Sequence, residues 1–131
     1  MIGYVTLGTN DLPRAATFYD AIAGEMGVGR MMDFENFIAW GAWDGAPGIA
    51  ATRPFDGEPA SVGNGTMVAI QAKDRDQVQR LYELALANGG RDEGEPGPRG
   101  EPDENGMVFY AAYFRDPDGN KLNAFLMDKA A

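Results

Sequence analysis

Residues 4–27, YVTLGTNDLPRAATFYDAIAGEMG, have a counterpart 63 positions later in residues 67–90, MVAIQAKDRDQVQRLYELALANGG. Few positions are identical, but both segments begin with alternating apolar residues, which is typical of a half-buried strand. An Asp follows each strand, and apolar residues then recur at helical spacing. These apolar positions are Ala15, Phe18, Tyr19 and Ile22 in the first segment and Val78, Leu81, Tyr82 and Ala85 in the second. The repeat predicts two copies of one strand–helix unit.

Segments rich in β-formers follow each predicted helix. They cover residues 28–34, 36–43 and 48–54 in the first half, and a short stretch near Gly90, 107–114 and 120–127 in the second. We therefore predict one α+β domain of 131 residues built from two tandem βαβββ modules. Module 1 is expected at about 1–54, a linker at 55–65 and module 2 at about 66–131, with helices near 13–24 and 75–88. Gly24 and Gly89 are expected to end the helices.

Residues 93–106, EGEPGPRGEPDENG, interrupt the second half. Their Gly, Pro and acidic residues predict a long loop, which is either a mobile surface segment or a lid over a ligand.

The charge balance limits the partners. With 20 Asp and Glu against 11 Lys and Arg, the net charge is -9, which disfavours nucleic acid and anionic membranes. This acidity serves solubility or reflects a preference for cationic ligands. The chain has no Cys and no apolar stretch that predicts a signal peptide or a membrane span, so we expect a soluble, cytoplasmic protein.

The chain closes with a second motif, FRDPDGNKLNAF at 114–125, in which Asp116 and Asp118 are predicted to stabilise a turn. Together with the repeat, this motif resembles the vicinal oxygen chelate superfamily, which includes glyoxalase I, bleomycin-resistance proteins and extradiol dioxygenases. The resemblance covers nearly the whole chain. It implies curved sheets that enclose a cleft, often completed across a homodimer. It also implies, in metal-dependent members, an ion held by a His on the first strand of each module and by carboxylates from the last strands.

Three positions depart from that metal-binding pattern. Tyr4 and Met67 stand where the two His residues would be, and Asn123 stands where the last strand would supply a carboxylate. The chain contains no His at all. A phenol, a thioether and a neutral amide are weak donors, so we expect no metal and no other cofactor. Without His and Cys, Ser–His and Cys–His nucleophile arrangements are excluded, and no catalytic residue can be assigned.

Strand alternation predicts which side chains line the cleft, because the helices should cover the aliphatic face of each sheet. The expected lining is Tyr4, Thr6, Met67, Gln71, Lys121, Asn123 and Phe125. The alternative is that these side chains only fill a collapsed barrel. Trp40, Trp43, Tyr110 and Tyr113 are either stacking surfaces for a planar ligand or residues of the core and interface.

Two functions remain open. The first is a metal-free, homodimeric protein that sequesters or carries a small molecule, as bleomycin-resistance proteins do. The alternative is a metal-dependent lyase, isomerase or dioxygenase of the same superfamily that uses substitute ligands.

Overall fold

The computed structural model describes residues 1–130 and contains two modules of the predicted βαβββ order. Module 1 comprises β1 (Tyr4–Gly8), α1 (Leu12–Glu25), β2 (Gly29–Asp33), β3 (Phe37–Gly41) and β4 (Gly48–Thr52). Module 2 comprises β5 (Val68–Gln71), α2 (Arg75–Ala87), β6 (Arg91–Arg99), β7 (Met107–Arg115) and β8 (Lys121–Lys129). The predicted fold class and both predicted helices are confirmed.

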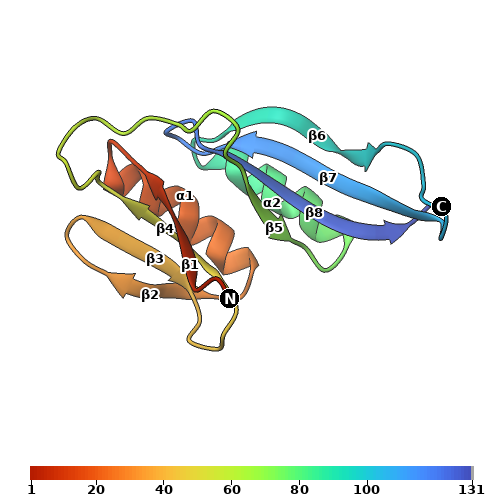
Figure 1. Ribbon diagram of the computed structural model, residues 1–131, viewed down its shortest axis with the longest axis horizontal. Helices are drawn as coiled ribbons and strands as arrows, with labels where there is room; N and C mark the ends of the chain where they lie inside the picture. The colour runs from red at the N-terminus through yellow and green to blue at the C-terminus, as the bar shows by residue number, and fades with distance from the viewer. Residues whose placement is uncertain (131) are drawn as a thin grey trace.

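The two sheets have the same topology, with strand orders β1-β4-β3-β2 and β5-β8-β7-β6. In each sheet the first strand runs parallel to the last strand of its module, and the other pairs are antiparallel. Both first strands, β1 and β5, are therefore edge strands. They are the strands of each sheet that face the other module (Figure 1).

The Asp that follows each first strand caps the next helix. Asp11 accepts a hydrogen bond from the backbone N–H of Arg14 at 3.1 Å, and Asp74 accepts one from Gln77 at 2.8 Å. Beyond the helix ends, Gly27 and Gly89 have φ angles of 76° and 95°, which favour glycine. The expected role of Gly24 as a helix end was wrong, because α1 continues through it to Glu25.

The prediction of a loop at 93–106 was wrong over its first half, where β6 pairs with β7 as far as Arg99. A strand containing Pro96 and Pro98 is possible here because β6 is the edge of its sheet, so a missing N–H removes no necessary pairing. Two irregularities in register, between Asp92 and Gly97, adapt the strand to its partner.

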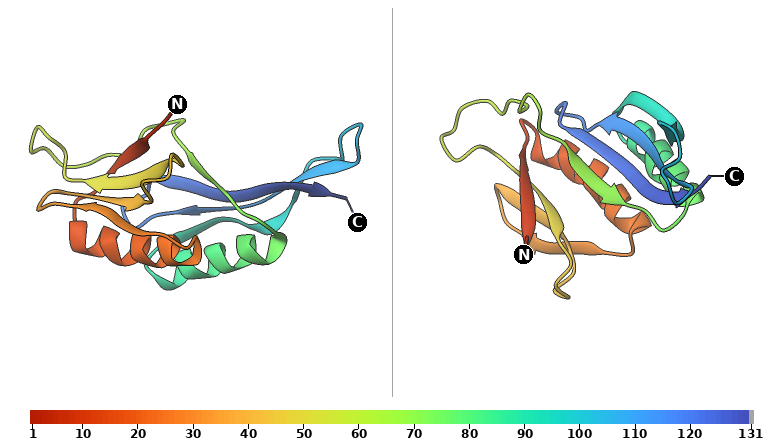
Figure 2. Two further views of the ribbon diagram at one scale, coloured as in Figure 1. Left: turned by 90° about the horizontal axis from the view of Figure 1, so that it is seen from below. Right: turned by 45° about the vertical axis from the view of Figure 1, so that its right-hand side comes forward.

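Both helices lie on the same side of the molecule, as the left view of Figure 2 shows. Alternate strand residues, among them Leu7, Ile70, Leu122 and Ala124, point to the helices and form the buried core. The opposite faces carry the residues predicted to line the cleft and are called the open faces below. None of the helices described is long and apolar enough to cross a membrane.

Candidate functional site

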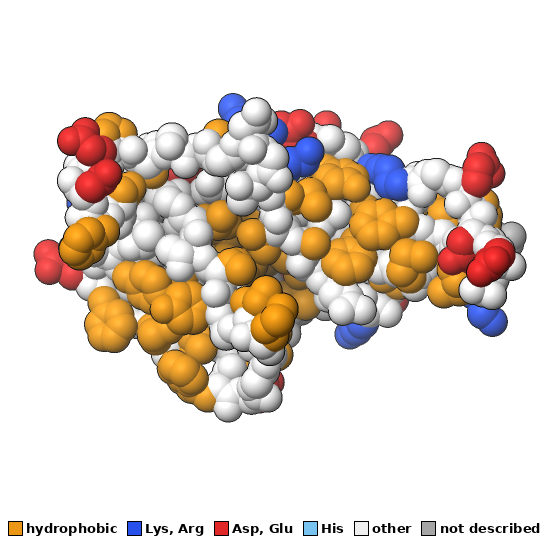
Figure 3. Space-filling model, viewed as in Figure 1, with side chains coloured by type: hydrophobic (Ala, Val, Ile, Leu, Met, Phe, Trp, Pro, Cys, Tyr) orange, Lys and Arg blue, Asp and Glu red, His pale blue; other side chains and the backbone are white. Residues whose placement is uncertain are grey.

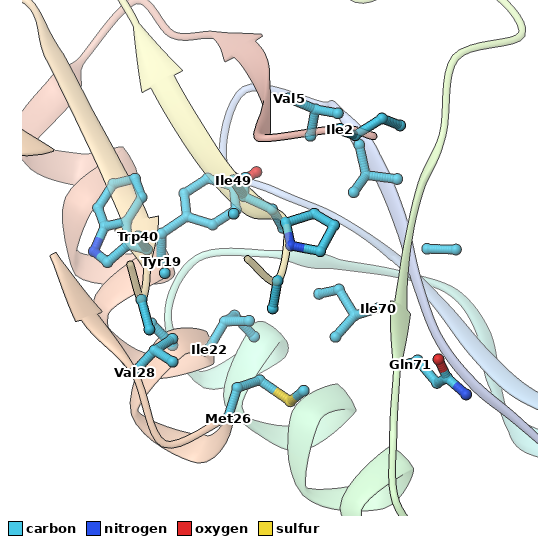
Figure 4. Close-up of a pocket in the computed structure, with 18 of the residues that line it drawn as sticks. Ile2, Val5, Tyr19, Ile22, Met26, Val28, Trp40, Ile49, Ile70 and Gln71 are labelled. Carbon is cyan, nitrogen blue, oxygen red and sulfur yellow. The ribbon is translucent and has the colours of Figure 1, made fainter. Parts of the chain in front are cut away.

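A cavity of about 620 Å³ lies between the two modules. Its walls come from β1, β3 and β4 of module 1 and from β5 of module 2, and α1 contributes its floor (Figure 4). On the space-filling surface, hydrophobic side chains gather in the hollow between the modules and continue over the open face of module 2 (Figure 3). The larger apolar side chains around the cavity are Ile2, Val5, Tyr19, Ile22, Met26, Val28, Trp40, Ile49, Met67, Val68 and Ile70.

The two aromatic residues of the cavity use their polar atoms elsewhere. The Tyr19 hydroxyl donates to Asp116 Oδ2 at 2.7 Å, and Trp40 Nε1 donates to Asp20 Oδ1, also at 2.7 Å. Each residue therefore offers only its ring to a ligand. The amide of Gln71, on β5, stands at the edge of the cavity (Figure 4). It is an exposed polar group that can form a hydrogen bond with a ligand. The arrangement is that of an apolar pocket with few polar contacts.

Tyr19 and its neighbour Asp20, which is hydrogen-bonded to Trp40, keep their ordinary protonation states. Burial, and then the charge of Asp116, raises the pKa of Tyr19 well above its usual value, so the phenol keeps its proton. The hydrogen bond from Arg30 lowers the pKa of Asp20, which stays ionised. Neither group is suited to exchanging a proton with a ligand near neutral pH.

Asn123 lies beside the cavity on the open face of module 2. In the sheet register it is paired with Ala69 of β5, which lines the cavity, and with Tyr113 of β7. Its side chain is fully buried, yet neither its amide nitrogen nor its amide oxygen has a hydrogen-bond partner among residues 1–130. Such unpaired groups are rare in folded proteins and call for an explanation.

Aromatic and basic side chains surround Asn123 on the same face. Phe125 stacks on Phe109 with ring centroids 5.3 Å apart. Lys121 Nζ lies 5.5 Å from the centroid of the Tyr113 ring, and Arg99 Cζ lies 5.4 Å from it. Around Tyr113 this face therefore combines rings, an amide and two cations, next to the ion pair of Arg115 and Glu93 at the start of β8.

The structure brings together five of the seven predicted cleft residues. Met67 and Gln71 line the cavity, while Lys121, Asn123 and Phe125 lie one strand away. Tyr4 and Thr6 belong to β1 of the other module, where Tyr4 packs edge-on against Phe37. Thr6 and Lys121 border a separate hollow of about 140 Å³.

Sequence reasoning missed the contribution of α1 to the cavity. Tyr19 and Ile22 were predicted only as part of a helical stripe that packs against a sheet, and both are indeed buried in the core. Because the gap between the modules exposes part of the same stripe, these side chains also form the cavity floor. Only the packing of the two modules could have revealed this.

The residues at the metal-ligand positions do not fit a divalent ion. Tyr4 and Met67 are 44% and 41% exposed and offer a phenol and a thioether, and Asn123 offers a neutral amide. In the described part of the chain, no group of three or more Asp and Glu side chains is placed to hold a metal.

The chain is similar to a known protein family and to several solved structures. The model of the Glyoxalase/Bleomycin resistance protein/Dioxygenase superfamily matches residues 1–124. A glyoxalase/bleomycin resistance protein from Albidiferax ferrireducens T118 is 34% identical, with a TM-score of 0.82 over 95% of this chain and 97% of that one. No curated protein matches the chain.

More distant structures share the fold. A lactoylglutathione lyase from Agrobacterium tumefaciens is 19% identical, with a TM-score of 0.65 over 95% of this chain and 92% of that one. A glyoxalase-related enzyme from Fulvimarina pelagi is also 19% identical, with a TM-score of 0.71 over 100% of this chain and 99% of that one. The match over residues 1–124 and the 34% identical relative show that the chain belongs to the glyoxalase/bleomycin resistance protein/dioxygenase superfamily.

Proposed function

We propose that this protein binds a small, largely apolar molecule without a metal ion and thereby sequesters or carries it. The observation that carries the proposal is the cavity between the modules. Its volume of about 620 Å³ suits a small-molecule ligand. Its lining is mostly aliphatic, thioether and aromatic, with Asp44 and Gln71 as its polar side chains, and its two buried rings have their polar atoms engaged elsewhere.

The ligand site extends from this cavity onto the open face of module 2. Met67 and Gln71 belong to the cavity wall, and Lys121, Asn123 and Phe125 belong to the adjoining strand. Tyr4 and Thr6 approach the ligand from module 1. We assign no catalytic residue, because Tyr19 and Asp20 are fixed in their protonation states by burial and by Arg30.

We propose that the working form is a homodimer. Large apolar side chains that are close to half exposed, including Ile2, Tyr4 and Met67, lie at or near the cavity, and a second copy would cover them. Light scattering should then give twice the 14.1 kDa chain mass. A Tyr4→Glu variant should shift the mass toward that of the monomer. A chain without Cys suits the reducing cytoplasm, where we propose that it acts.

Calorimetry with a neutral aromatic probe, 2-naphthaleneethanol, tests the binding function. We expect saturable binding at the cavity that is weakened by a bulky substitution in its wall. Metal analysis of protein purified without chelators provides the opposing test. Stoichiometric metal, together with turnover after addition of nickel, zinc or iron, would overturn the proposal in favour of a metal-dependent lyase, isomerase or dioxygenase.

A further inference from the structure

We infer that the ligand is an apolar carboxylic acid whose carboxylate is bound by Lys121 and Asn123 on the open face of module 2. Its apolar part would extend past Ala69 into the cavity between the modules. The inference rests on the proposed function, because the apolar part occupies the same cavity. It specifies the charge of the ligand, which the sequence left open.

Lys121 and Arg99, the two cations beside Tyr113, have no acidic partner of their own. Within residues 1–130, no carboxylate lies within ion-pair distance of Lys121 or Arg99. Arg99 donates only to backbone carbonyls, those of Glu95 at 2.6 Å and Pro98 at 3.4 Å. Other cations within residues 1–130, such as Arg53 and Lys73, also lack an ion pair. What distinguishes Lys121 and Arg99 is that both lie over the ring of Tyr113. An anionic ligand would supply the missing charge.

Glu93 is the acidic group that most directly competes for Lys121. The charge of Lys121 contributes to the lowered pKa of Glu93, but the hydrogen bond from Arg115 is the main cause. Arg115 Nε donates to Glu93 at 2.7 Å, so the charge of Glu93 is already matched. Lys121 therefore remains available to a ligand.

Asn123 provides a hydrogen-bond donor two residues along the same strand face. Its fully buried amide has no hydrogen-bond partner within residues 1–130, and an N–H of this amide can donate to a carboxylate oxygen. Because the amide is fully buried, a ligand must displace a neighbouring side chain on this face to reach it. A bound carboxylate would give the amide nitrogen the acceptor that it lacks.

The register of the sheet connects this position to the cavity. Asn123 is paired with Ala69, and adjacent strands are spaced by about 4.8 Å. Ala69 is exposed and belongs to the cavity wall. A molecule with an anionic end at Lys121 therefore needs to cross only one strand for its apolar part to enter the cavity.

Calorimetry with three matched probes tests the inference: 2-naphthaleneacetate, neutral 2-naphthaleneethanol and cationic 2-(2-naphthyl)ethylamine. We expect the acetate to bind about tenfold more tightly than the alcohol, the factor for one charge-assisted contact. The amine should bind most weakly. Lys121→Gln should remove the preference for the acetate without lowering the affinity for the alcohol. Arg99→Gln should reduce this preference to a smaller extent, and Lys121→Arg should retain it.

Lys129→Gln is the matched control, because Lys129 lies at the far end of β8 and its loss changes the net charge equally. The preference for the acetate should persist in this variant. Equal binding of acetate and alcohol by the parent protein, or a preference that survives Lys121→Gln, would overturn the inference and leave the binding function intact. Failure of all three probes to bind would overturn both.

Discussion

The Tyr19 hydroxyl donates to Asp116 Oδ2 at 2.7 Å, and both side chains are almost completely buried. This bond joins α1 of module 1 to the turn before β8 of module 2. Asn120 strengthens the same junction, because its Nδ2 donates both to Asp116 Oδ2 and to the carbonyl of Gly8, each at 2.9 Å. The ring of Tyr19 also lines the cavity, so one side chain both joins the modules and shapes the site.

Loss of this hydroxyl should weaken the whole domain. Tyr19→Phe removes a hydrogen bond to a charged acceptor and leaves Asp116 less well paired, which we expect to cost about 1.5–3 kcal/mol of unfolding free energy. Chemical denaturation followed by circular dichroism measures this change. Tyr4→Phe is the control, since the exposed Tyr4 should change stability by no more than about 0.5 kcal/mol. If Tyr19→Phe and Tyr4→Phe were equally stable, the hydrogen bond between Tyr19 and Asp116 would not stabilise the domain.

Alkaline pH should reduce the difference in stability between the parent protein and Tyr19→Phe. The folded-state pKa of Tyr19 is raised well above 10, so above about pH 10 only the unfolded state loses this proton. The contribution of the Tyr19 hydroxyl to the unfolding free energy is therefore fully present below pH 10 and falls as the pH rises further. The difference in unfolding free energy between the two proteins should shrink by up to about 1.4 kcal/mol per pH unit. Denaturation curves at pH 9, 10 and 11 measure it, and a constant difference would contradict the assignment.

Local signals in the sequence were sufficient for most of the fold. The 63-residue repeat predicted both modules, because strand alternation, the capping Asp and the helical stripe are each set by nearby residues. Strand β6 was missed because Pro96 and Pro98 are unfavourable in a strand, and only its position at a sheet edge makes them acceptable.

The site depended on relationships that local patterns do not contain. Alternation predicted that Asn123 lies opposite the helix-facing residues, but its lack of a hydrogen-bond partner within residues 1–130 follows from its surroundings in three dimensions. The acidic composition suggested cationic ligands as one option, whereas Lys121 and Arg99 meet around Tyr113 from different strands. Net charge therefore did not predict the local charge at the site.

A bulky side chain in the cavity wall should block binding without unfolding the protein. Ala69 is exposed on β5, so Ala69→Phe can place its ring over the cavity and the adjoining face at little cost to the core. We expect the affinity for both 2-naphthaleneethanol and 2-naphthaleneacetate to fall by about tenfold or more. The same change at exposed Ala87, on the last turn of α2, should leave both affinities unaltered. Unchanged binding in Ala69→Phe would place the ligand elsewhere.

Asn123→Leu should make the protein more stable and a poorer receptor for anions. Within residues 1–130 no group pairs with the Asn123 amide, so its loss leaves no buried partner unpaired. Leu has the same branching as Asn and removes two buried, unpaired polar atoms, each of which carries a desolvation cost of about 1–3 kcal/mol. The melting temperature should therefore rise, while the affinity for 2-naphthaleneacetate falls and that for 2-naphthaleneethanol is retained. Thermal denaturation and calorimetry on the same preparations measure the two effects.

Asn88→Leu is the control, because Asn88 caps α2 and its Nδ2 donates to the carbonyl of Leu84 at 2.8 Å. This variant should therefore be less stable than the parent. A loss of stability in Asn123→Leu without a change in the affinity for the acetate would mean that Asn123 serves the fold alone.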